Sequence, residues 1–107
     1  MEYGVIDIGA NTIRLSIFKY NEEKNIVKLV TNKKVIVGLT GYVKKGQLSA
    51  LGITKLCRTL QKLKMSLENF EIKDYSVFAT ASLRNISNTE EVLKEIEKTT
   101  ETRNYSW

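Results

Sequence analysis

The chain of 107 residues has no histidine, no proline and a single cysteine. Because Cys57 is the only thiol, no disulfide can form within the chain, and a cysteine–histidine zinc site is excluded. The absence of histidine also excludes a histidine base and the usual serine-hydrolase triad. The lack of proline fits short, closely connected elements but decides nothing about the fold.

Long apolar runs are also missing, since none approaches the roughly 20 residues that span a membrane. Glu2 and Asp7 lie where a secretory signal would have a basic start and an apolar run. These features, together with the lone cysteine, predict a cytoplasmic protein without a membrane segment. With 42% hydrophobic and 27% charged residues, residues 1–107 are expected to form one small globular domain.

Acidic residues are scarce in the middle of the chain. Between Lys19 and Lys64 there are 11 basic residues and two acids, Glu22 and Glu23, within a formal net charge of +5. Such a segment attracts polyanions or an acidic partner, although a solvated lysine-rich surface explains it equally well. Few aromatic residues lie among the lysines, so no stacking surface is indicated and nucleic acid is not expected as the partner.

Hydrophobic periodicity predicts an α/β domain with elements in the order β-β-β-α-β-α. The first three strands are expected at residues 3–8, 13–18 and 26–37, with a break near 31–33, followed by a surface loop at 38–46. Ser49 is the expected N-cap of a helix with one apolar stripe, in which Cys57 is a core thiol.

A strand at 75–79, a loop and a second helix starting near Asn88 complete the pattern. The Asn88–Glu91 spacing is that of a capping box. About residues 99–107 show no pattern and are expected to form a disordered or unrelated tail. The strand–helix–strand order implies a parallel pair with a right-handed crossover, so the sheet should be mixed.

The turn between the first two expected strands is the main candidate for chemistry. Asp7 ends the first strand, and Gly9, Ala10, Asn11 and Thr12 follow in or beside the turn. Gly9 allows either a close backbone approach or a positive φ, and the N–H groups after it can form an anion-binding nest. A carboxylate beside a phosphate nest is expected where a divalent metal bridges protein and phosphate. An ordinary hairpin turn is the alternative.

Two separated segments together resemble the exopolyphosphatase/guanosine pentaphosphate phosphatase (Ppx/GppA) family. They are residues 7–18 and 78–88, and residues 35–39 and 46–49 between them are similar to further family segments. The resemblance covers about residues 5–99. It implies a ribonuclease H-like, actin-like ATPase fold, here an N-terminal half-domain that is truncated before its last strand.

The resemblance implies roles for individual residues. The positions that fall on the family's first phosphate-binding loop are Gly9, Ala10, Asn11 and Thr12. Ala10 stands where serine or threonine is usual, so a hydroxyl contact is lost while the backbone donor remains. Asp7 is the implied protein ligand of Mg²⁺. Arg84 falls on the arginine of an Ala-Thr-x-x-x-Arg motif and Thr80 on its threonine, and the planar guanidinium suits two phosphate oxygens. A surface arginine near a helix cap is the alternative.

The implied activity is metal-assisted hydrolysis of a phosphoanhydride bond in polyphosphate or guanosine pentaphosphate. The sequence lacks the family's Ser-Gly-Glu-Glu-Glu segment, which resembles the site of the catalytic base, and its second loop, Asp-Ile-Gly-Gly-Gly-Ser. No catalytic residue is therefore assigned, and the chain alone is expected to hydrolyse little or nothing.

Three interpretations stay open. The chain is a truncated or split phosphohydrolase that needs a C-terminal half, or a non-catalytic module that binds polyphosphate or nucleotide. The third is an assembly module that pairs through an exposed sheet edge with another chain or a second copy of itself.

Overall fold

The computed structural model describes residues 1–79, 83, 85–100 and 105–106. The strands of its main sheet are β1 (Glu2–Ile8), β2 (Thr12–Asn21), β3 (Ile26–Ile36), β6 (Tyr75–Ala79) and β7 (Tyr105–Ser106). The helices are α1 (Ala50–Asn69), α3 (Thr89–Thr100) and the short 3-10 helix η1 (Leu39–Tyr42). A small separate hairpin consists of β4 (Val43–Lys44) and β5 (Gln47–Leu48).

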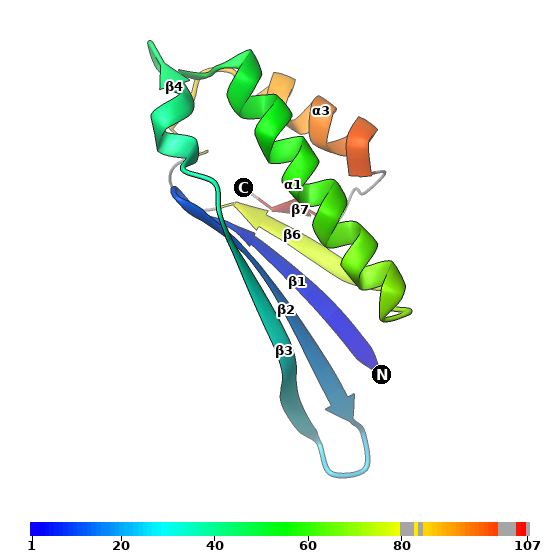
Figure 1. Ribbon diagram of the computed structural model, residues 1–107. Coiled ribbons are helices and arrows are strands. Elements are labelled where there is room, and N and C mark those ends of the chain that lie inside the picture. Colours follow the sequence, from blue (N-terminus) through cyan, green and yellow to red (C-terminus); the bar gives the residue numbers. More distant parts are fainter. Residues whose placement is uncertain (80–82, 84, 101–104, 107) are drawn as a thin grey trace.

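The five strands of the main sheet lie in the order β3-β2-β1-β6-β7, and α1 and α3 cover the same face of it (Figure 1). β1 pairs antiparallel with β2 and parallel with β6, so the sheet is mixed. The structure thus confirms the predicted α/β architecture and the order of its six principal elements.

The core lies between the sheet and the two helices. Alternate residues of β1 and β2 point toward the helices and are buried; these are Gly4, Ile6, Ile8, Ile13, Leu15 and Ile17. From α1 the predicted apolar stripe is buried against them. The Ser49 side chain accepts a hydrogen bond from the Gly52 N–H at 3.2 Å, which confirms the predicted N-cap. Cys57 is buried in this stripe, and desolvation raises the pKa of its thiol, as suits a core residue.

The third strand differs from its sequence pattern. β3 is continuous through residues 31–33, and the pairing with β2 shifts register between Ile17 and Phe18, just beside the expected break. Every residue of β3 except the half-buried Val35 is exposed, including Val27 and Leu29. β3 is an outer strand whose far end projects with β2 beyond the helices, as Figure 1 shows, so its apolar residues find no covering layer.

Two segments carry more structure than the sequence indicated. Residues 38–46, expected as a surface loop, contain η1 and β4, and Leu39 is buried. In the region expected as a tail, Thr100 is a buried residue of α3, and β7 pairs parallel with β6 where the half-domain was expected to stop. A two-residue strand is too short to show a hydrophobic period, which is why the pattern missed it. Among the described residues, no helix is both long and apolar enough to cross a lipid bilayer.

Candidate functional site

The turn from β1 to β2 is closed by its own backbone. The Gly9 N–H donates to the Thr12 carbonyl at 2.8 Å. A Cβ atom on Gly9 would lie 3.0 Å from that same carbonyl oxygen, which is tighter than nearly all real contacts. Gly9 is not among the described glycines with a positive φ, which are Gly38 and Gly46. The sequence left open whether Gly9 is needed for a positive φ or for a close approach of the backbone. The structure supports the close approach, here to the Thr12 carbonyl.

The carbonyl groups of the turn are held by a segment about 30 residues further along the chain. The Asn11 carbonyl accepts from the N–H groups of Val37 and Gly38, both at 2.8 Å. The Ala10 carbonyl accepts from the Thr40 N–H at 3.1 Å and from the Thr40 hydroxyl at 2.9 Å. We call residues 37–40 the clasp. Because both carbonyls are bonded to the clasp, the two peptide groups that contain them are fixed in orientation.

The N–H groups of Ala10 and Asn11 have no acceptor within the described part of the chain, and both residues are exposed. A trans peptide points its N–H away from its C=O, so the Asn11 N–H is directed away from the clasp. The clasp therefore orients the Asn11 N–H, and successive N–H groups without an acceptor are what an anion-binding nest requires. The structure thus brings Gly9, Ala10, Asn11 and Thr12 together in one turn with two donors available.

Asp7 lies on the sheet face opposite the helices. Its neighbours there are Arg14 on β2 and Phe78 on β6, and all three side chains are exposed. The described residues contain no group of three or more histidine, cysteine or acidic side chains that could hold a metal. A lone carboxylate fits an ion such as Mg²⁺, which keeps several waters and takes its other ligands from a phosphate group.

Arg84 and Thr80 lie outside the described residues. The strand that leads to them is described, however, and Ala79 at the end of β6 pairs with Ile8 at the end of β1. Since the two strands are parallel, the chain leaves β6 at the same sheet edge as the β1–β2 turn. Ligands of α/β sheets bind at this carboxyl edge.

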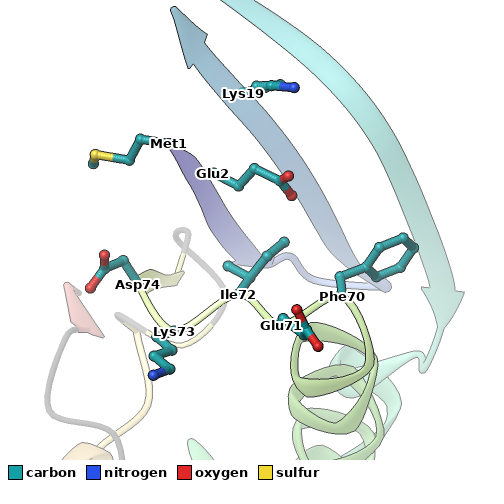
Figure 2. A pocket seen from close by; sticks show the side chains of 8 residues that line it. All are labelled: Met1, Glu2, Lys19, Phe70, Glu71, Ile72, Lys73 and Asp74. Atoms are coloured by element: carbon teal, nitrogen blue, oxygen red, sulfur yellow. The ribbon is translucent and has the colours of Figure 1, made fainter.

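A cavity that is unrelated to the turn lies at the opposite end of β1. This cavity of about 370 Å³ is shown in Figure 2 and is lined by Met1, Glu2, Lys19, Phe70, Glu71, Ile72, Lys73 and Asp74. Acidic and basic side chains are mixed around it, so it offers no selectivity for an anion. We therefore place the candidate site at the turn.

Sequence reasoning missed two residues beside the turn. Arg14 is a direct cross-strand neighbour of Asp7, and the alternation of β2 already placed it away from the core. Thr40 could not have been found in this way, because it lies about 30 residues from the turn along the chain and meets it only through the tertiary fold.

Comparison with known proteins identifies the family. A sequence model described as the Ppx/GppA phosphatase family matches residues 16–103, which is most of the chain. The chain belongs to the Ppx/GppA phosphatase family. The match begins after Thr12, so the membership does not depend on the turn motif. It confirms the resemblance seen in the sequence.

Known Ppx/GppA proteins support both family and fold. Exopolyphosphatase 1 of Mycobacterium bovis and of Mycobacterium tuberculosis is 24% identical over 100 residues, which cover 94% of this chain and 29% of theirs. The crystal structure of the Aquifex aeolicus Ppx/GppA family member superposes with a TM-score of 0.85 at 23% identity, covering 95% of this chain and 33% of that one.

An exopolyphosphatase from Cytophaga hutchinsonii superposes equally well, with a TM-score of 0.85, 25% identity, and coverage of 98% of this chain and 33% of that one. The half-domain fold is thereby confirmed. The chain spans about a third of the length of the Ppx/GppA structures that it matches.

Proposed function

We propose that this Ppx/GppA domain binds a phosphoryl group of a phosphate-chain anion, polyphosphate or guanosine pentaphosphate, at the β1–β2 turn. One observation carries the proposal: the Ala10 carbonyl is bonded to the clasp, which orients the Asn11 N–H of the same peptide, and neither this N–H nor that of Ala10 has an acceptor in the described part of the chain. A turn arranged in this way presents two N–H donors to an oxygen anion.

Arg84 is proposed as the second contact. β6 ends at the same sheet edge as the turn, and a guanidinium can bond two phosphate oxygens at once. The basic residues between Lys19 and Lys64 would add a longer-range attraction that weakens with salt.

Asp7 is proposed as the protein ligand for a divalent metal, with Mg²⁺ as the expected ion. The exposed carboxylate lies two residues before Gly9, on a face where no other acid is its cross-strand partner. When bound, the metal would neutralise charge on the phosphate chain. Asp7 itself would hold the ion and would orient the ligand relative to the turn.

Phosphoanhydride hydrolysis is proposed only for an assembly that also supplies a catalytic base. Three of the relatives are named exopolyphosphatases, but the chain covers only about a third or less of their length. Asp7 is assigned to the metal and no carboxylate here is assigned as the base. We therefore expect this chain alone to bind phosphate chains without releasing phosphate at an appreciable rate. A non-catalytic binding module is the second candidate function, and the same available donors support it.

Calorimetric titration with sodium tripolyphosphate tests the proposal, with sodium sulfate as the competing anion. The wild-type chain should bind tripolyphosphate, and Gly9→Ala should weaken binding because the added Cβ would crowd the Thr12 carbonyl. Gly41→Ala is the matched control, since a Cβ there meets no atom within 4 Å. Equal affinities of the two variants would contradict a site at the turn. Adding a separately expressed C-terminal half of a Ppx/GppA protein and assaying phosphate release then distinguishes the enzyme half from the binding module.

A further inference from the structure

Thr40 bonds to the turn through both its side chain and its backbone, although neither the sequence pattern nor the family resemblance singled it out. Its hydroxyl lies 2.9 Å from the Ala10 carbonyl oxygen and 3.3 Å from Asn11 Oδ1. A hydroxyl has one proton, so it can donate to only one of these oxygens at a time, and the shorter contact is with the carbonyl. With its own N–H at 3.1 Å, Thr40 supplies two donors to that one carbonyl.

The orientation of the Ala10–Asn11 peptide follows from these two bonds. While the carbonyl is bonded to Thr40, the trans geometry keeps the Asn11 N–H pointing the other way. A peptide rotated by half a turn would present its carbonyl oxygen to an incoming phosphate and would repel it. The same bonds occupy the Ala10 carbonyl, so it is not available as a ligand for a cation.

Tyr42, two residues after the clasp, is bonded to α1 and to the N-cap residue of that helix. The Tyr42 carbonyl accepts from the Ser49 N–H at 2.9 Å, and its hydroxyl accepts from Lys55 Nζ at 3.1 Å. Leu39 is buried in the core. The backbone on both sides of Thr40 is therefore held in place. The Thr40 side chain itself is exposed and does not pack in the core.

We propose that Thr40 is a positioning residue of the phosphate-binding turn: its hydroxyl fixes the Ala10–Asn11 peptide so that the turn recognises oxygen anions and leaves metal binding to Asp7. This inference rests on the proposed function, because it assumes that the turn binds phosphate. It assigns the selectivity of the turn to a residue about 30 positions away in the sequence.

The experiment compares Thr40→Val, which removes the hydroxyl but keeps the size and the N–H of Thr40, with Thr40→Ser, which restores a hydroxyl. Thr40→Ala is a second hydroxyl-free variant should the valine disturb folding. Thr54→Val is the matched control, because Thr54 is also exposed and its hydroxyl bonds to the Ala50 carbonyl at 3.0 Å within α1. The probe is sodium tripolyphosphate, and the readouts are the Kd and the amide chemical shift of Asn11.

We expect Thr40→Val and Thr40→Ala to bind tripolyphosphate about threefold to tenfold more weakly, the effect of losing one hydrogen bond. The Asn11 amide should also respond less to the ligand, whereas Thr40→Ser and Thr54→Val should match the wild type. Unchanged binding by the hydroxyl-free variants, or no restoration by serine, would overturn the role of Thr40 and leave the proposed function standing. A wild-type chain that does not bind tripolyphosphate would overturn both.

Discussion

The side chain of Asn88 bonds both backbone polar groups of Leu48. Its Nδ2 donates to the Leu48 carbonyl at 2.9 Å, and its Oδ1 accepts from the Leu48 N–H at 3.0 Å. The spacing Asn88–Glu91 suggested a capping box, and the two side chains do bond, Asn88 Nδ2 to Glu91 Oε2 at 3.3 Å. The Asn88 side chain also ties the start of α3 to β5. This tether connects the segment after β6 to the hairpin that leads into α1.

Asn88→Ala should destabilise the fold by about 1–3 kcal/mol, because Leu48 is buried and both of its backbone groups would lose a partner. Urea denaturation measures the change in the free energy of unfolding. Asn85→Ala, at an exposed asparagine nearby, is the control and should change it by less than about 0.5 kcal/mol. Equal effects of the two variants would show that the tether contributes nothing.

Gly52→Ala should destabilise the protein although alanine is the better helix former. A Cβ at Gly52 would lie 2.7 Å from Leu48 Cδ1 and 2.7 Å from Tyr42 Cβ, and the second atom is attached directly to backbone. We expect a loss of about 1–3 kcal/mol from overpacking, measured by thermal or urea unfolding. Gly41→Ala is the matched change in open space and should be neutral. A stabilised Gly52→Ala variant would mean that α1 does not pack closely on η1.

Asp7→Asn should remove the dependence of tripolyphosphate binding on Mg²⁺. The wild-type Kd should fall when Mg²⁺ is added, because the ion would join the carboxylate to the phosphate chain. Calorimetry with and without Mg²⁺ measures both constants. Glu2→Gln provides a control at the opposite end of the same strand. If Asp7→Asn retained the full effect of Mg²⁺, another group would hold the metal.

Arg84→Ala should weaken tripolyphosphate binding more than Arg58→Ala, which removes an exposed arginine of α1. A guanidinium that bonds two phosphate oxygens contributes more than one that only adds to the surface potential. Titrations at low and moderate salt separate these two effects, since only the second is strongly screened. Similar losses for both variants would support the surface interpretation of Arg84.

The sheet could be predicted because its inner strands carry their own pattern. Ile13, Leu15 and Ile17 alternate with polar residues and are buried as that alternation requires. β3 shows the limit of such reasoning, because Val27 and Leu29 are as apolar as core residues but lie on an outer strand beyond the helices. The position of a strand within its sheet is decided by tertiary structure, so it cannot be read from the hydrophobic pattern of that strand alone.

The candidate site was predictable in its chemistry but not in its construction. The sequence of Gly9 to Thr12 indicated a turn with available N–H groups. The clasp that orients those groups acts mainly through backbone atoms of Val37, Gly38 and Thr40, and backbone donors are the same for almost every residue type. The sequence therefore does not indicate that the clasp, most of which was expected to belong to a surface loop, holds the turn in place.

The most direct test of phosphate binding at the turn is a ¹⁵N–¹H spectrum of the wild-type chain titrated with sodium tripolyphosphate. If the turn binds phosphate, the amide signals of Ala10 and Asn11 should shift most and should saturate together with the calorimetric binding curve. Shifts confined to lysine-rich β3, for example at Lys28 and Lys33, with Ala10 and Asn11 unchanged, would contradict the proposed site.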